Sequence, residues 1–378
     1  MSPSFLLVTS FYPQFVNRLY EREPGLAEQA YAAQLDRLLT SGFSAVDAYR
    51  NGLARLGCDV DVVIVDADRL QRQWAREHGL DLQDSDDRRR RQRRIVEAQI
   101  AAARPDVLYV FEWSPLGDDF LRGVRRHVGS IVGQIASPLR PDRTYRSYNL
   151  MISALPTLVE HFRENGMHSE RLKLGFDPRV LTRLSRGAPQ HEVTFVGGFA
   201  EVHDDRIPWL ERLAEEVDID VFGYGMDRVP ATSPIHERYR GEAWGYDMFS
   251  VLAHSRITLN MHARIDVGSS RDGKVAANMR LYEATGVGTC LVTDHKDNLA
   301  ELFEPGREVA TYKNPDACAA TVKRLLADEP ARRSIAAAGQ MRTLAEHGYD
   351  ARMVELLELL GPLARHGPTR RSAVAAGR

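Results

Sequence analysis

The sequence has few of the residues that mark specialised classes of protein. Its 378 residues include three cysteines, Cys58, Cys290 and Cys318, which are too few and too widely spaced for a disulfide framework or a zinc cluster. No apolar run approaches the roughly 18 residues of a membrane span, and the first run, residues 5–8, is too short for a signal peptide. We therefore expect a cytoplasmic protein in a reducing compartment.

Strong charge of one sign is also missing. The 50 basic and 52 acidic side chains leave a formal charge of −2, so the overall field does not favour nucleic acid as a partner. Lysine is scarce, with only five residues, so nearly all basic side chains are arginines and a single arginine is a weak indication of phosphate binding. The densest run, from Arg88 to Arg94, is expected either to form a solvated helix face or to make a weak contact with an anionic membrane surface.

Apolar stretches of strand length alternate with helical stretches along the whole chain. Strands are expected at residues 4–9, 59–65, 106–111, 130–135, 150–153, 193–196, 218–222, 256–260, 289–293 and 308–311. Helices are expected at residues 34–56, 84–103, 156–165, 206–216, 247–254, 278–285, 316–327, 331–347 and 350–360. This alternation predicts parallel pairing, and hence an α/β fold of two doubly wound, Rossmann-like domains that face a cleft.

The domain boundaries follow from a change in composition. Prolines and glycines without a clear period predict a linker at residues 176–190. It would join an N-terminal domain, residues 1–175, to a C-terminal domain, residues 191–348. A helix at residues 349–361 and a flexible tail at residues 362–378 would complete the chain.

Small and polar residues follow the expected strands of the C-terminal half. Gly197 and Gly198 follow the first of these strands, Gly223 and Tyr224 the second, and His262 the third. Ligands of open α/β sheets bind at the carboxyl ends of the strands, and a glycine lets a phosphate approach the backbone closely. Each glycine pair can equally be an ordinary turn.

The most informative element is the helix expected to begin at Asn278. Its first amides lack partners within the helix and its dipole is positive there, so it would stabilise an anion such as a diphosphate. Arg280 and Glu283 would share one face, about 4.5 Å apart along the axis, which resembles the step from the phosphates of a nucleotide to its ribose. The alternative is a surface ion pair worth about 0.2–0.5 kcal/mol. Neither GxGxxG nor GxxxxGK[ST] is present.

Four segments resemble the C-terminal domain of GT-B glycosyltransferases. They are VTFVGGF at 193–199, DVFGYG at 220–225, ITLNMH at 257–262 and NMRLYEATGVGTCLVTD at 278–294. Within the group-1 transferases, the branch that they look most like is the CgeB-like, spore-maturation type, and residues 306–357 resemble the closing helices of that family. The resemblance covers residues 190–360 well and the N-terminal domain only in its general plan.

The resemblance implies a nucleotide-sugar donor site in the C-terminal domain. It places ribose on Glu283 and diphosphate on Arg280 and the first amides of the helix, with the nucleotide base near Tyr224. The donor-binding residues expected on this basis are Gly197, Gly198, Gly223, Tyr224, Asn278, Met279, Arg280 and Glu283. Many relatives carry an earlier glutamate that reaches the sugar, whereas this chain has Val275 at that position.

Sugar transfer from a nucleotide donor requires stabilisation of charge on the leaving diphosphate. Fixed cations and helix amides can supply it, so no metal ligands and no cofactor are expected. If the reaction retains the anomeric configuration, as in many relatives, the leaving phosphate can take the proton of the acceptor. If it inverts, Glu112 is the candidate base, since it directly follows an expected strand. His262 is the other catalytic candidate, for a contact with the sugar or the diphosphate, with a structural role as the alternative.

We therefore expect a metal-independent glycosyltransferase that transfers a sugar, with retention, from a nucleotide-diphosphate sugar to a glycan, protein or small-molecule acceptor. A nucleotide-sugar epimerase of the same fold is a second interpretation. A non-catalytic nucleotide-sugar-binding module is a third, and Val275 is the residue that favours it.

Overall fold

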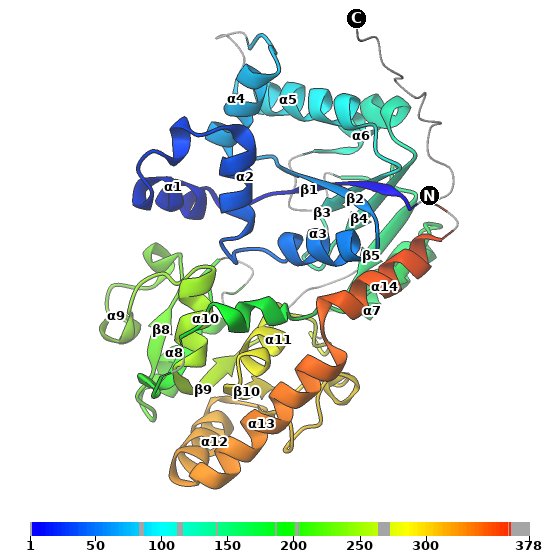
Figure 1. Ribbon diagram of the computed structural model, residues 1–378. Helices are drawn as coiled ribbons and strands as arrows, with labels where there is room; N and C mark the ends of the chain where they lie inside the picture. The colour runs from blue at the N-terminus through cyan, green and yellow to red at the C-terminus, as the bar shows by residue number, and fades with distance from the viewer. Residues whose placement is uncertain are drawn as a thin grey trace, which may run out of the picture.

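The computed structural model describes residues 2–82, 87–111, 116–140, 143–185, 187–200, 203, 205–263, 273–361 and 363 (Figure 1). It has two lobes, each built on one parallel β-sheet with helices on both faces. We call the lobe that holds β1 to β6 the N-lobe and the lobe that holds β7 to β11 the C-lobe. The predicted α/β class with two doubly wound domains is confirmed.

The N-lobe sheet has the strand order β2-β1-β3-β4-β5-β6, and every pair of neighbours is parallel. Its strands are β1 (Ser4–Thr9), β2 (Asp59–Ile64), β3 (Val107–Phe111), β4 (Ser130–Gln134), β5 (Leu150–Ser153) and β6 (Ser169–Arg171). Its helices are α1 (Pro13–Arg22), α2 (Tyr31–Leu39), α3 (Val46–Arg55), α4 (Asp68–Glu77), α5 (Arg88–Ala103), α6 (Asp118–Val124) and α7 (Pro156–Glu164).

The C-lobe sheet has the strand order β11-β10-β9-β7-β8, again with parallel neighbours. Its strands are β7 (His191–Val196), β8 (Asp220–Phe222), β9 (Ser255–Asn260), β10 (Cys290–Asp294) and β11 (Ala310–Tyr312). The helices in the second half of the chain are α8 (Arg206–Ala214), α9 (Ile235–Arg238), α10 (Tyr246–Ala253), α11 (Met279–Gly286), α12 (Pro315–Ala327), α13 (Glu329–Glu346) and α14 (Tyr349–Leu360).

The chain crosses between the lobes at two places that lie side by side. The backbone N–H of Phe176 donates to the carbonyl oxygen of His347 at 2.8 Å, and the N–H of Tyr349 donates to that of Phe176 at 3.1 Å. After the second crossing, α14 packs on α3 in the core of the N-lobe, where Met353 and Leu356 are fully buried. The last described helix therefore belongs to the first lobe, as Figure 1 shows.

Two of the predicted helices need correction. The expected helix at residues 34–56 is wrong as a single element, because α2 ends at Leu39 and α3 begins at Val46. Gly42 lies between them with a φ of +75°, and a Cβ atom there would lie 3.1 Å from the ring of Tyr246 in the C-lobe. The helix expected from residue 84 begins at Arg88 among the described residues, and the carboxylate of Asp87 caps it by accepting from the N–H of Arg90 at 2.8 Å.

The arginine run at the start of α5 is largely engaged within the N-lobe. Arg91 pairs with Asp68 at 3.1 Å and Arg93 pairs with Asp119 at 2.6 Å. Arg94 donates to the carbonyl oxygen of Asp81 at 2.9 Å. A membrane contact through this run stays a prediction. Within the described ranges, no helix is both long and apolar enough to cross a membrane.

Candidate active site

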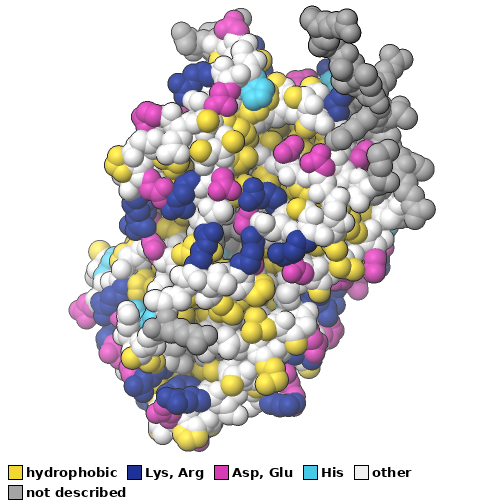
Figure 2. Space-filling view, viewed as in Figure 1, with side chains coloured by type: hydrophobic (Ala, Val, Ile, Leu, Met, Phe, Trp, Pro, Cys, Tyr) yellow, Lys and Arg dark blue, Asp and Glu magenta, His cyan; other side chains and the backbone are white. Residues whose placement is uncertain are grey.

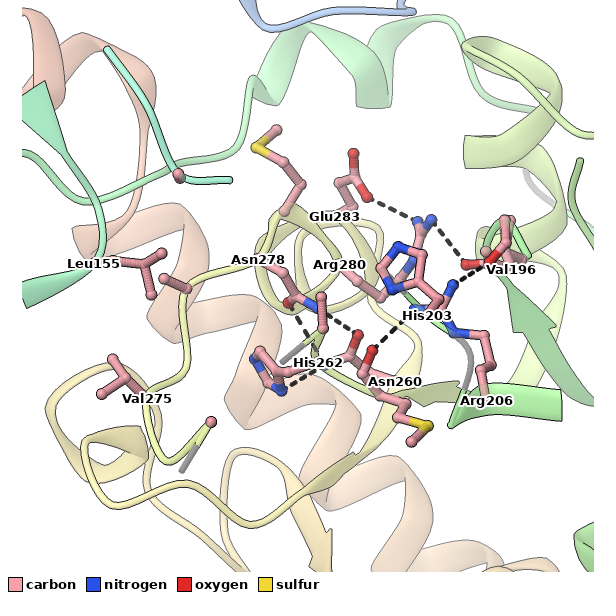
Figure 3. Close-up of a pocket in the computed structure, with 18 of the residues that line it drawn as sticks. Leu155, Val196, His203, Arg206, Asn260, His262, Val275, Asn278, Arg280 and Glu283 are labelled. Carbon is pink, nitrogen blue, oxygen red and sulfur yellow. Dashed lines mark hydrogen bonds and ion pairs between the residues drawn. The ribbon is translucent and has the colours of Figure 1, made fainter. Parts of the chain in front are cut away.

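A cavity of about 410 Å³ lies between the lobes, at the carboxyl ends of β7 and β9 (Figure 3). The N-lobe contributes Tyr12, Ala136, Leu155 and Thr157 to its lining. The C-lobe contributes Phe195, Val196, Gly197, Gly198, His203, Arg206, Met248, Asn260, Met261, His262, Ala263, Gly273, Lys274, Val275, Ala277, Asn278, Met279, Arg280 and Glu283. The structure therefore has a cavity where the cleft between the two domains was predicted. Most of the predicted donor-binding residues line it, namely Gly197, Gly198, Asn278, Met279, Arg280 and Glu283.

Helix α11 points its first turn at this cavity. Asn278 is in an extended conformation just before the helix, and its side chain makes no cap hydrogen bond to the helix. Instead, its amide nitrogen donates to Oδ1 of Asn260 at 2.8 Å, which ties the start of α11 to the end of β9. Asn278, Met279 and Arg280 line the cavity, so the positive end of the helix lies there, and its side-chain cap is absent.

Arg280 and Glu283 form an ion pair of 2.8 Å on the cavity wall. Each of the two side chains is only 13% exposed, so the pair is not a solvated surface pair. Arg280 also donates to the carbonyl oxygen of Val196 at 3.2 Å, while its buried Nε has no partner among the described residues. Burial raises the pKa of Glu283, and the charge of Arg280 opposes this rise. The pair combines a cation and a carboxylate one helical turn apart, as the spacing predicted.

Arg206, the first residue of α8, is the functional candidate that the sequence analysis missed. It is 6% exposed and donates hydrogen bonds to the carbonyl oxygens of Gly198 and, at 3.2 Å, Met261. Its guanidinium lies over the ring of Phe195, 5.1 Å from the centroid. Burial lowers the pKa of Arg206 to about 10, although nearby tyrosines partly oppose the change. A buried cation on a cavity wall is suited to bind an anion.

His262 lies at the end of β9 with its Nδ1 atom 2.6 Å from Oδ1 of Asp294. Asp294 ends β10 and also pairs with Lys296 at 3.0 Å. Burial raises the pKa of Asp294, but the hydrogen bond and charge of His262, together with Lys296, outweigh this and lower it to about 2. His262 was predicted as a site residue, whereas its partner Asp294, and Lys296 behind it, were not.

The glycines at the ends of β7 and β8 are explained by close packing of the two loops. A Cβ atom at Gly223 would lie 2.0 Å from the carbonyl oxygen of Gly197, and one at Gly198 would lie 2.3 Å from Cζ of Tyr224. Gly197 and Gly198 line the cavity. Gly223 and Tyr224 are not among the described residues that line it, and a base contact by Tyr224 stays a prediction.

Tyr224 instead belongs to an aromatic cluster that joins the lobes. Its ring stacks on that of Trp244, with centroids 5.2 Å apart and an interplanar angle of 19°. Tyr12 of the N-lobe packs edge-on against Tyr224, with centroids 5.4 Å apart, and Tyr12 itself lines the cavity. The cluster therefore forms the border of the cavity on the side of β8.

The remaining expected residues fall at the edges of the site. Val275 lines the cavity together with Ala277 and Leu155, and all three belong to one apolar cluster that spans the lobes. Glu112 lies outside the described residues, so its role as a base stays a prediction. Within the described part of the chain, no group of three or more His, Cys, Asp or Glu side chains is arranged to hold a metal ion.

Part of the chain is similar to a known protein family. Residues 206–358 match the family model described as glycosyl transferase-like. The match begins at Arg206 and includes α11, so it contains most of the cavity wall. No curated protein matches the chain significantly.

Solved structures share the fold over nearly the whole chain. Anabaena HepE in complex with UDP-glucose has a TM-score of 0.59 and 12% identity, covering 95% of this chain and 100% of that one. Sucrose-phosphate synthase from Thermosynechococcus elongatus has a TM-score of 0.54 and 10% identity, covering 96% and 99%. A glycosyltransferase from Rickettsia africae has a TM-score of 0.57 and 8% identity, covering 96% and 98%. The predicted GT-B fold is confirmed.

Proposed function

We propose that this protein is a glycosyltransferase that moves a sugar from a nucleotide-diphosphate sugar to an acceptor hydroxyl group. The observation that carries the proposal is the buried Arg280–Glu283 pair on the first turns of α11, on the wall of a cavity between two lobes. The glycosyl transferase-like match over residues 206–358 supports it. The motif formed by Asn278, Arg280 and Glu283 favours the CgeB-like branch within this class.

The donor is proposed to lie along the wall formed by the C-lobe. Its diphosphate would bind Arg206, Arg280 and the amides near Asn278 and Met279, because cations and helix amides converge there. Its ribose hydroxyls would donate to the carboxylate of Glu283, one turn further along α11. Gly197 and Gly198 would allow the phosphates or the sugar to approach the backbone.

The chemistry that this arrangement supports is stabilisation of the leaving group. As the bond between the sugar and the diphosphate breaks, negative charge grows on the phosphate oxygen, and the two arginines and the helix dipole oppose that charge. We propose that the reaction is metal-independent and retaining, with the acceptor proton taken up by the leaving phosphate. Analysis of the product by NMR would reveal the anomeric configuration. An inverted product would make Glu112 the first base to test.

The first donors to test are UDP-sugars, because Anabaena HepE was solved with UDP-glucose. The protein is incubated with UDP-, dTDP-, GDP- and ADP-sugars, with and without simple glycan acceptors. Release of free nucleotide that an acceptor accelerates is the expected result. Interconversion of the sugar without release would replace the proposal with an epimerase, and binding without turnover would replace it with a binding module.

A variant on α11 and a matched control test whether Glu283 binds the donor. Glu283→Gln should weaken nucleotide-sugar binding by about 1–3 kcal/mol in titration calorimetry, since it removes a charged acceptor of hydrogen bonds. The matched control is Glu346→Gln, which breaks an exposed pair with Arg342 on α13, 2.6 Å long. Equal affinities for Glu283→Gln and the unchanged protein would show that Glu283 does not bind the ribose of the donor.

A further inference from the structure

Three titratable side chains from two neighbouring strand ends form a connected row beneath the cavity. His262 follows β9, Asp294 ends β10, and Lys296 lies two residues beyond. The His262–Asp294 contact is 2.6 Å and the Asp294–Lys296 contact is 3.0 Å. The side chains are 3%, 17% and 12% exposed, respectively, so the row is shielded from water.

The two nitrogen atoms of His262 have different surroundings. Nδ1 faces Asp294, whose low pKa keeps it a carboxylate that accepts a hydrogen bond. The backbone N–H of His262 donates to the same oxygen at 3.2 Å, which fixes the ring further. Nε2 is buried and has no hydrogen-bond partner among the described residues, although His262 lines the cavity (Figure 3). Leaving a buried polar atom without a hydrogen bond costs free energy. We therefore expect a group of a bound ligand to pair with Nε2.

We propose that Asp294, held by Lys296, is a positioning residue that sets His262 as an imidazolium whose Nε2–H donates to the diphosphate of a bound nucleotide sugar. The inference rests on the proposed function and names a contact within that site. The carboxylate fixes the proton on Nδ1, and its charge together with that of the diphosphate favours the second proton on Nε2. Arg206 donates to the carbonyl oxygen of Met261, next to His262, so the two cations would meet the same anion.

The transfer balances in electrons and protons without taking a proton from His262. The bond between the anomeric carbon and the phosphate oxygen breaks, and its electron pair goes to that oxygen. The acceptor oxygen bonds to the anomeric carbon, and its proton passes to the released diphosphate. His262 donates a hydrogen bond to the oxygen that gains charge and keeps its own proton throughout.

The test follows the affinity for a nucleotide sugar from about pH 5.5 to 8.5, the range in which histidine charge changes. UDP-glucose, dTDP-glucose, GDP-mannose and ADP-glucose are first titrated at neutral pH, and the tightest is used. A free nucleoside diphosphate is avoided, because its terminal phosphate titrates at about pH 6 and would mask the histidine. The titratable and charged groups around His262 are, on the cavity lining, His203, Arg206, Lys274, Arg280 and Glu283, and, in the row behind it, Asp294 and Lys296.

The unchanged protein should lose about tenfold in affinity as pH rises through this range, which corresponds to the loss of one charged hydrogen bond. His262→Gln should abolish this dependence. Asp294→Asn should move the fall in affinity to lower pH by about one unit, because the anion that favours the imidazolium is gone. Lys296→Met should move it to higher pH, because a competing cation is gone. His236→Gln, which alters a histidine on α9 bound to the carbonyl oxygen of Pro230 at 3.1 Å, is the control.

Asp294→Asn and Lys296→Met should shift the pH at which affinity falls in opposite directions. A general loss of structure would instead weaken binding equally at every pH. Two-bond proton–nitrogen NMR of the histidines, with His262→Gln for assignment, should show a proton on both nitrogens of His262 in the complex. An unaltered pH dependence in His262→Gln, or an unshifted one in both Asp294→Asn and Lys296→Met, would overturn the inference and leave the proposed function standing. Failure of all four nucleotide sugars to bind would count against the proposed function itself and this inference with it.

Discussion

The guanidinium of Arg280 and the carboxylate of Glu283 hold each other at 2.8 Å on the wall of a cavity, with each side chain only 13% exposed. Neither charge is fully compensated by the other, because Arg280 has an unpaired buried Nε and burial raises the pKa of Glu283. The site thus presents a cation and a carboxylate already oriented by the same helix. A ligand with phosphates and hydroxyl groups would complete the bonding of both.

Breaking the pair from one side should be costly. We expect Arg280→Met to lower the free energy of unfolding by about 3 kcal/mol, because it leaves Glu283 buried without its cation. The double variant Arg280→Met/Glu283→Gln should recover at least about 1 kcal/mol, since no orphaned carboxylate remains. Urea denaturation at neutral pH measures both values. Losses that simply add would show that the two side chains are not coupled.

Arg206 should serve binding at the expense of stability. Burial lowers its pKa to about 10, so keeping it charged at neutral pH costs free energy in the folded state without a ligand. We expect Arg206→Met to leave the melting temperature of the ligand-free protein unchanged or higher, because the apolar side chain removes a buried charge. Its affinity for a nucleotide sugar should fall by about 2 kcal/mol. A large loss of stability with unchanged affinity would instead make Arg206 a structural residue.

Gly198 should not tolerate a side chain. A Cβ atom there would lie 2.3 Å from Cζ of Tyr224, so Gly198→Ala must displace the ring or the loop. We expect a loss of about 1–3 kcal/mol in the free energy of unfolding, and weaker donor binding. Tyr224→Ala in the same chain should restore the stability by making room. The control is Gly123→Ala on α6, where a Cβ atom would have no neighbour within 4 Å.

Sugar transfer should be insensitive to chelators. The proposed leaving-group stabilisation comes from Arg206, Arg280 and the first turn of α11, none of which EDTA affects. Initial rates of nucleotide release with an acceptor, measured before and after treatment with EDTA, test this expectation. Abolition by the chelator with rescue by manganese would show that a metal ion takes part.

The site residues that could be predicted from the sequence are those whose partners lie close by in the chain. Arg280 and Glu283 are three residues apart, and helical spacing alone places them on one face. Arg206 could not be recognised in this way, because its partners are the carbonyl oxygens of Gly198 and Met261, 8 and 55 residues away, and its helix has the pattern of an ordinary amphipathic surface helix. The same holds for His262 and Asp294, which are 32 residues apart and meet only because β9 and β10 are neighbours in the sheet.

The same distinction applies to the fold. Strands such as β1 were predicted correctly, because a run of buried apolar residues is a local signal. The break between α2 and α3 was missed, although Ser41, Gly42 and Ser44 between the two helices are typical of a turn. The turn faces the other lobe, where the N–H of Tyr246 donates to the carbonyl oxygen of Ser41 at 3.3 Å. Helix α1 was also missed, although its apolar positions Phe15, Val16, Leu19 and Tyr20 follow a helical period. Figure 2 shows basic side chains gathered where the lobes meet, an arrangement that no single segment encodes.

The position of α14 determines when each lobe can be completed during synthesis on the ribosome. Its residues Met353, Leu356 and Leu360 are fully buried in the N-lobe core, although the entire C-lobe separates them from β6 in the chain. The C-lobe can therefore finish folding while the N-lobe still exposes the apolar surface beside α3. The lobe that is translated first is the one that is completed last.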